Sequence, residues 1–211
     1  MDQYSSDVAF TPTVKEIQTR RGSREEYRYM EECGGWRTTV TPELAAYLAD
    51  RDSMYLATTN AQGQPYVQHR GGPKGFLKVL DEHTIAFADF NGNKQYITTG
   101  NLQENDRAFI FLMDYMNRRR IKLWGRARVV EDDMDLVAQL MPRNYRARAI
   151  QAIVFTVSAW DVNCHQHIPQ KFGAAVVEAS LEKLNARIAE LEAENQQLRG
   201  QLEQTNNTSG I

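Results

Sequence analysis

The chain has 211 residues and a formal net charge of -2 at pH 7, with 42% hydrophobic and 25% charged residues. This length and composition fit one globular domain with an appendage, and the slight acidity argues against a general polyanion-binding surface. The two cysteines, Cys33 and Cys164, give no disulfide framework and favour a reduced, cytoplasmic setting.

The first residues lack the apolar core of a secretory signal. No run approaches the roughly 18 apolar residues that a membrane span needs. We therefore expect a soluble, cytoplasmic protein.

Residues 1–40 are expected to form an N-terminal arm and helix. Residues 1–12 are predicted to be a loose arm, and residues 13–32 favour helix with Gly22 as a break. Thr41, Pro42 and Glu43 then supply a hydroxyl N-cap, a proline at the first helical position and an acid in the first turn. They predict a short helix that ends near Asp50.

Residues 41–172 are predicted to form the main domain. Short β-branched and aromatic runs alternate there with turn clusters at roughly even spacing, the pattern of an antiparallel barrel or sandwich. Helices are predicted over residues 94–102 and 133–141, and a polar loop over 163–171. Strands are predicted over residues 54–59, 65–70, 76–80, 84–90, 108–115, 120–131 and 149–160.

Residues 173–204 are predicted to form a coiled-coil helix, followed by a disordered tail over 205–211. Apolar residues recur there with alternating spacings of three and four, which defines an a/d heptad seam. A lone asparagine at an a position, Asn195, favours a parallel two-stranded pairing. The alternative is an amphipathic helix packed on its own domain. The seam residues are Leu181, Leu184, Ile188, Leu191, Asn195, Leu198 and Leu202.

Two segments contain side chains that suit an anion. In the first, alternation places Gln68 and Arg70 on one strand face, directly before Gly71 and Gly72, so a guanidinium and backbone amides can approach one anion. The alternative is a glycine-rich bend with solvated charges. The segment is neither a Walker loop nor a dinucleotide fingerprint, because their glycine spacings are absent.

The second segment runs over residues 89–95, where a turn leads into a predicted helix N-terminus. Unpaired helix amides together with Lys94 suit a terminal phosphate. The alternative is an ordinary helix start with an exposed lysine.

Two further groups of residues are weaker candidates. Arg120, Lys122 and Trp124 share a strand face, but no aromatic interleaving extends this basic patch, so we expect no nucleic-acid binding. Cys164, His165 and His167 are metal-ligand types, but adjacent Cys and His rarely meet at one tetrahedral centre and no second cluster completes it. We expect no metal site.

These stretches, in this order, resemble the pyridoxamine 5'-phosphate oxidase-like FMN-binding split barrels, over about residues 40–172. The likeness rests on GQPYVQHRGGPKGF, IAFADFNGNKQYITTGNLQENDRAFIFL and RRRIKLWGRARVVE. It implies a mainly β protein with flanking helices, built as a six-stranded antiparallel split barrel. It also implies a homodimer with FMN at the subunit interface. The C-terminal coiled-coil helix lies outside the resemblance.

By position, the resemblance implies a set of cofactor-binding residues. One strand would run along the flavin ring and ribityl chain, and the segment after the Asn91-Gly92 turn would hold the phosphate. Relatives with this fold use FMN, the deazaflavin F420 or haem, so F420 and haem remain alternatives to FMN. The implied residues are Gln68, His69, Arg70, Gly71, Ala88, Asp89, Asn93, Lys94, Gln95, Arg120 and Trp160.

The function expected from this resemblance is a flavin-dependent oxidoreductase acting on a small molecule, with no catalytic residue assigned. The chain has HRGGPKG where the oxidase proper has a longer basic run, which argues against pyridoxamine phosphate as the substrate. One alternative is a non-catalytic flavin carrier or sensor with a coiled-coil interaction tail. Another is an adaptor built on an empty barrel.

Overall fold

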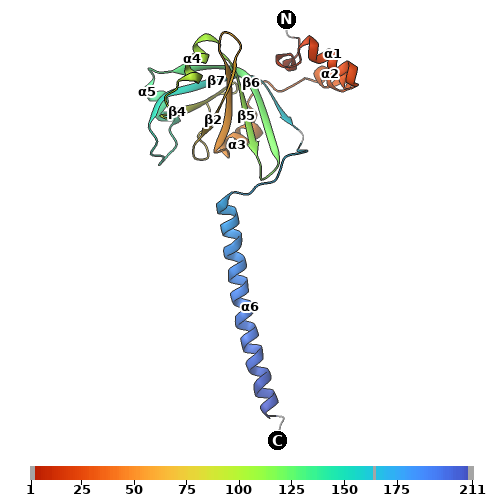
Figure 1. The fold of residues 1–211 in the computed structure, drawn as a ribbon, viewed down its shortest axis with the longest axis vertical. Helices are drawn as coiled ribbons and strands as arrows, with labels where there is room; N and C mark the ends of the chain where they lie inside the picture. Colours follow the sequence, from red (N-terminus) through yellow and green to blue (C-terminus); the bar gives the residue numbers. More distant parts are fainter. Residues whose placement is uncertain (1–2, 164, 209–211) are drawn as a thin grey trace. The chain divides into compact units, whose positions relative to one another are not determined.

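A computed structural model describes residues 3–163 and 165–208 (Figure 1). The chain divides into two compact units, one formed by residues 3–114 and 118–168 and the other by residues 115–117 and 169 onward. The first unit contains one sheet of seven antiparallel strands in the order β2-β1-β5-β6-β7-β4-β3. The strands are β1 (Ser53–Thr59), β2 (Pro65–Gly71), β3 (Lys78–Val79), β4 (Thr84–Phe90), β5 (Arg107–Asp114), β6 (Arg119–Val130) and β7 (Ala149–Asn163).

The predicted fold class, a mainly β split barrel with flanking helices, is confirmed. Each of the seven predicted strand segments contains an observed strand. The resemblance implied six strands, and the additional one is β3, a two-residue strand that pairs only with β4 at the edge of the sheet.

One hydrophobic core explains why the sheet curves. Strands β1 and β5 alternate between buried and more exposed residues, so each contributes one face to the core. Leu56, Ile110, Leu123 and Phe155 come from four different strands and belong to the same buried cluster. Since a single cluster collects residues from strands across the sheet order, the sheet wraps around it.

Helices α3 (Pro42–Ala49) and α5 (Met134–Leu140) form where the sequence predicts them. The Thr41 hydroxyl accepts a hydrogen bond from the Leu44 amide at 3.3 Å, as its N-cap position requires. Helix α5 packs on a second buried cluster that contains Ala86, Ala88, Val137, Leu140, Ala152 and Val154. Strand β4 is consequently buried on both faces.

Helix α4 (Ile97–Glu104) begins three residues later than predicted. Lys94 and Tyr96 have φ angles of 56° and 55°, in the left-handed region, so the chain cannot continue as an α-helix through them. The expected helix start at Lys94 is therefore wrong, and residues 91–96 form a loop that precedes the helix.

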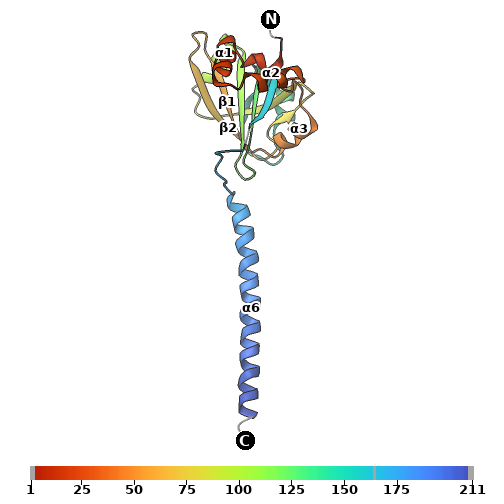
Figure 2. The ribbon, with the colours of Figure 1, turned by 90° about the vertical axis from the view of Figure 1, so that its right-hand side faces the viewer.

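The prediction of a loose arm over residues 1–12 is wrong, because the described part of it contains the 3-10 helix η1 (Ser5–Val8) and the start of α1 (Pro12–Arg21). The helical prediction over residues 13–32 is confirmed by α1 and α2 (Arg24–Glu32), which the turned view of Figure 2 brings to the front. Gly22, with φ of 83°, ends α1 as predicted. We call residues 3–36 the N-terminal cap.

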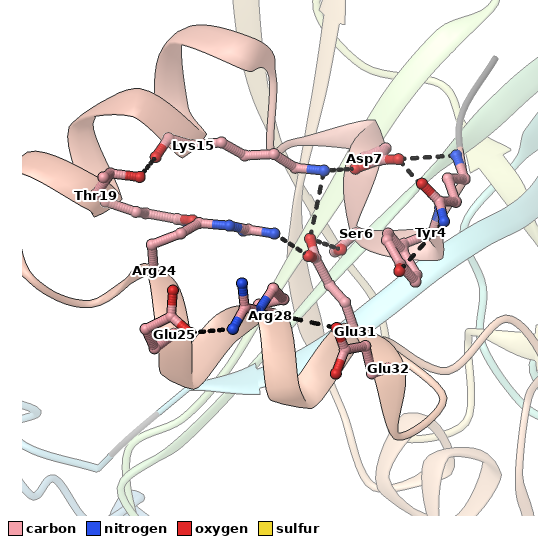
Figure 3. A network of polar contacts seen from close by, with 12 residues as sticks. Tyr4, Ser6, Asp7, Lys15, Thr19, Arg24, Glu25, Arg28, Glu31 and Glu32 are labelled. Carbon is pink, nitrogen blue, oxygen red and sulfur yellow. Dashed lines mark hydrogen bonds and ion pairs between the residues drawn. The ribbon is translucent and has the colours of Figure 1, made fainter.

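A buried carboxylate holds the cap together (Figure 3). The Glu31 side chain is 0% exposed, forms an ion pair with Arg24, and accepts a hydrogen bond from the Ser6 hydroxyl at 2.9 Å. Lys15 lies 3.6 Å from Glu31 and also pairs with Asp7 at 2.5 Å. Three segments of the cap are therefore tied to one charge.

An aromatic stack joins the cap to the sheet. The rings of Trp36 and Trp124 of β6 are 4.5 Å apart and nearly parallel, and Phe10 meets Trp36 edge-on at 4.9 Å. The Lys122 ammonium lies over both tryptophan rings. Aromatic pairs of this kind contribute about 0.5–1.5 kcal/mol beyond their burial.

Gly125 marks a register shift between β6 and β7, next to Trp124. A Cβ at Gly125 would lie 2.1 Å from the Thr156 carbonyl oxygen and 2.7 Å from a ring atom of Phe155. We expect Gly125→Ala to destabilise the protein by about 3 kcal/mol, because the backbone oxygen cannot move aside cheaply. For a chain of this size this lowers the melting temperature by roughly 10 °C.

The matched control for that prediction is Gly100→Ala. Gly100 lies inside α4 without a positive φ, and a Cβ added there would meet no atom within 4 Å. Alanine at this position is expected to stabilise the helix by about 0.5–1 kcal/mol. Equal melting temperatures for the two variants would contradict the steric explanation.

The second unit contains the long helix α6 (Ala174–Thr208). The helix predicted over 173–204 thus extends to Thr208, and residues 209–211 of the predicted tail lie outside the described residues. Across the part of the chain that the structure describes, no helix combines the length and the apolar character that crossing a membrane requires.

Candidate functional site

A hollow lies between β2, the end of β4, the 91–96 loop and the start of α4. Its volume is about 180 Å³, which is smaller than a typical site for a whole cofactor and large enough for part of one. Its lining residues are Tyr66, Gln68, Arg70, Asp89, Phe90, Asn91, Gly92, Asn93, Lys94, Gln95, Tyr96, Ile97, Thr98, Thr99 and Ile150. We call this hollow the β2–α4 pocket.

Strand alternation places one face of β2 in the pocket. Tyr66, Gln68 and Arg70 share this face, and the Tyr66 hydroxyl donates a hydrogen bond to the Gln68 side chain. His69 points to the opposite face, where it meets Tyr55 edge-on with ring centroids 5.6 Å apart.

Arg70 is held in place by a buried carboxylate on β4. Its Nη1 lies 2.5 Å from Asp89 Oδ1, while Gln151 Nε2 donates to Asp89 Oδ2 at 2.8 Å and to the Thr99 hydroxyl at 3.0 Å. Asp89 and Gln151 are both buried. The guanidinium is consequently oriented by a network that spans β2, β4, β7 and α4.

Arg70 nevertheless keeps an unused hydrogen-bond donor. Among the buried side-chain polar atoms of residues 3–163 and 165–204, only Arg70 Nε and Asn163 Oδ1 have no partner. Buried donors normally find an acceptor, because leaving one unpaired costs about 1–3 kcal/mol. Arg70 also lines the pocket, so an anion bound there would lie beside its guanidinium.

The loop before α4 forms the opposite wall. Lys94 and Tyr96 occupy the left-handed region, which is uncommon for residues other than glycine and is concentrated at ligand-binding sites. The Asn93 side chain accepts from the Gln95 amide at 3.2 Å. Helix α4 has no side-chain cap, and its first residues line the pocket, so its free amides and positive end face the hollow.

The structure brings together part of the predicted residue set. Residues from two strands and one loop, distant along the chain, meet at the β2–α4 pocket. These are Gln68, Arg70, Asp89, Asn93, Lys94 and Gln95.

The other predicted residues lie elsewhere. Ala88 packs in the cluster under α5, and Trp160 is buried in the main core with its indole N–H donating to the Thr39 carbonyl at 2.8 Å. Arg120 lies on β6 opposite Asn163, away from the pocket lining. His69 and Gly71 are on β2 but do not line the pocket. A cofactor contact by these five residues stays a prediction.

Sequence reasoning missed several pocket residues. Tyr66 could have been found, because it precedes Gln68 and Arg70 on the same alternating face. Thr99, which lines the pocket, and Gln151, which does not line it but hydrogen-bonds to Asp89 and Thr99, gave no local signal. Gln151 reaches the site because β7 pairs with β4 in a register that sets it opposite Asp89.

No group of three His, Cys, Asp or Glu side chains within the described ranges is arranged to hold a metal ion. The Cys164 member of the weak metal candidate lies outside the described residues.

The curled antiparallel sheet, with a basic, amide-rich pocket beside β2 and α4, defines a split-barrel protein with a candidate ligand pocket. The model of the pyridoxamine 5'-phosphate oxidase family matches residues 40–187, so the chain belongs to that family. The N-terminal cap lies outside the matched region. No curated protein sequence matches the chain.

Several solved structures are similar to this chain. HupZ from Group A Streptococcus has 15% identity and a TM-score of 0.48, with 63% of this chain and 99% of that one covered. A putative pyridoxamine 5'-phosphate oxidase from Lactobacillus delbrueckii has 19% identity and a TM-score of 0.46, with 59% and 95% covered. An FMN-binding protein from Syntrophomonas wolfei has 16% identity and a TM-score of 0.46, with 71% and 96% covered.

Proposed function

We propose that the β2–α4 pocket binds the phosphate end of FMN, and that the protein is a flavin-dependent oxidoreductase acting on a small molecule. The observation that carries the proposal is the convergence of the Arg70 guanidinium, Lys94 and the uncapped start of α4 on one hollow. Each of these is a donor or a positive charge, and a phosphate monoester is a dianion rich in acceptors.

The charge balance of the pocket fits this ligand. Its lining carries two cations, Arg70 and Lys94, and one carboxylate, Asp89. The carboxylate fixes the position of the guanidinium, so Arg70 loses little conformational entropy when it meets an anion. Lys94 is exposed and can follow the phosphate as it enters.

The amide side chains of Gln68, Asn93 and Gln95 supply further donors and acceptors along the same wall. We assign them to the ribityl hydroxyls and the polar edge of the ring. Tyr66 and Tyr96 add aromatic surface at the pocket. Bound flavin would supply hydride transfer, while this chain orients the cofactor and limits the access of water.

We also propose that a second copy of the chain completes the site. The face of the sheet opposite the core carries Tyr55, Val67 and His69, all exposed, beside the aromatic rings of Phe109 and Phe111. An apolar sheet face of this kind favours a protein interface. In such a dimer the predicted contacts of His69 and Gly71 would come from this face and its edge.

The absorbance spectrum of the purified full-length protein tests the proposal. We expect the two flavin bands in the visible and near-ultraviolet, either as purified or after FMN is added and the excess removed. A deazaflavin or haem spectrum would assign one of the alternative cofactors. A protein that gains no band with any of the three is an adaptor on an empty barrel.

Repeated reduction and reoxidation of the bound flavin would distinguish an enzyme from a non-catalytic flavin carrier. With FMN bound, we expect NADH or NADPH to bleach the flavin and oxygen or an added acceptor to restore it repeatedly. Flavin that binds but is never reduced by either nucleotide would support the non-catalytic carrier or sensor.

A further inference from the structure

Helix α6 carries an apolar stripe along one side. Its a and d residues are exposed, from 46% at Leu191 to 63% at Leu202. Val177, 44% exposed, continues the d positions by one heptad toward the helix start. The helix has 35 residues, which corresponds to about 52 Å at about 1.5 Å per residue. The stripe is therefore long enough for a stable two-stranded seam.

The only polar residue in this seam between Leu181 and Leu202 is Asn195, at an a position. In a parallel, in-register pair each a residue faces its own copy, so the two Asn195 amides can hydrogen-bond to each other. In an antiparallel pair a residues face d residues, which would place Asn195 against a leucine. A buried amide without a partner costs about 1–3 kcal/mol.

The charges beside the seam are complementary between copies. Arg187 and Glu194 occupy g positions, and Glu192 and Arg199 occupy the e positions that follow them. A parallel pair would bring Arg187 to Glu192 and Glu194 to Arg199 of the other helix, both attractive. Within one helix, Arg187 pairs with Glu190 at 2.9 Å and Arg199 with Asn195 at 3.0 Å, but these contacts are solvent-exposed and weak.

We propose that α6 is a self-association element that pairs with α6 of a second copy as a parallel, in-register coiled coil. The partner helix is α6 of a second, identical chain, because both Asn195 and the flanking charges complement an identical helix. This element is separate from the flavin pocket and lies for the most part beyond the region matched by the family model.

Cysteine cross-linking of the full-length chain tests both direction and register. In a background with Cys33 and Cys164 replaced by serine, a single cysteine is introduced as Leu184→Cys or Leu198→Cys, both at d positions. In a parallel in-register pair each cysteine faces its copy with Cα atoms within the roughly 7 Å that a disulfide allows. We expect each variant to oxidise to a species of twice the chain mass.

Ala193→Cys is the matched control, because position 193 lies on the outer face of the helix at f. It should remain uncross-linked. Cross-linking of all three variants would indicate collision of unpaired tails and overturn the proposal. Cross-linking of none, or of one d variant without the other, would overturn it in favour of a different partner or an antiparallel or shifted pairing.

A seam substitution adds a second readout. Leu191→Arg, made in the Leu198→Cys background, places a charge in the seam and should abolish the disulfide. The flavin spectrum should be unchanged, since no α6 residue lines the β2–α4 pocket. Failure of cofactor binding and failure of the coiled coil are thus observed independently.

Discussion

Replacing Arg70 with glutamine is expected to weaken FMN binding by about 10- to 100-fold. A hydrogen bond from a charged donor contributes about 1.5–3 kcal/mol, and each 1.4 kcal/mol is about a tenfold change in affinity. Glutamine removes the guanidinium and its unpartnered Nε, while Gln151 still satisfies one oxygen of Asp89. Quenching of flavin fluorescence during titration measures the dissociation constant.

Two further variants test whether the loss of FMN affinity is specific to the Arg70 guanidinium. Arg128→Gln removes an exposed arginine of β6 that does not line the pocket, so FMN affinity should be unchanged. Arg70→Lys keeps the charge and should recover part of the affinity, although an ammonium cannot reproduce the planar guanidinium fork. If Arg70→Gln is folded by near-ultraviolet circular dichroism and binds FMN as tightly as the parent, the pocket is not the phosphate site.

The strands could be predicted from local sequence because apolar and polar side chains alternate along several of them with a period of two residues. The alternation in β1 and β5 reflects one buried face, and turn residues separate the strands. The later start of α4 was not predictable, because the left-handed conformations of Lys94 and Tyr96 run against the ordinary preference of these residues.

The same distinction applies to the candidate site. Residues close together in sequence could be predicted, whereas contacts between distant strands could not. Gln68 and Arg70, and Asn93 to Gln95, were found because each group is contiguous or alternates on one strand. The pairing of Arg70 with Asp89 depends on how the edge strand β2 and the strand β4, which are separated by four strands in the sheet order, approach each other as the sheet curls. Trp160 was assigned to the cofactor by its position in the chain; its side chain packs in the core, and a cofactor contact stays a prediction.

The N-terminal cap shows why charge patterns mislead. Residues 13–32 are helix-prone and rich in charge, and nothing in this pattern indicates that the Glu31 side chain is fully buried. Arg24 precedes Glu31 by seven residues on the same face of α2, but Ser6 is 25 residues away, and no local spacing connects it to Glu31. Burial of a charge is set by tertiary pairing, which one sequence does not display.

Replacing Arg24 with methionine is expected to destabilise the cap by about 3 kcal/mol at neutral pH. The change leaves the Glu31 carboxylate buried, with Ser6 and the more distant Lys15 as its remaining partners. Removing one member of a buried ion pair is costly because the other charge stays out of water. Amide hydrogen exchange in α1 and α2 measures the free energy of local opening.

The pKa of Glu31 determines whether the stability of the cap rises or falls as the pH is lowered. Burial by itself raises the pKa of Glu31, but the hydrogen bonds from Arg24 and Ser6 and the charge of Lys15 outweigh it and hold the pKa below its usual value. In the parent, this carboxylate therefore stabilises the cap above its unfolded pKa, and the contribution is lost as the pH falls through the folded value. Without Arg24 burial dominates, the folded pKa rises, and acidification should stabilise the cap instead.

Arg28→Met is the matched control, since Arg28 lies on the same helix but pairs with the exposed Glu25 and Glu32. Its loss should cost no more than about 1 kcal/mol, with little change in pH dependence. The double substitution Arg24→Met with Glu31→Gln removes both charges and should be less destabilised at neutral pH than Arg24→Met alone. If Arg24→Met and Arg28→Met cost the same, and both keep the parent's response to acid, then Glu31 does not hold the cap through its charge.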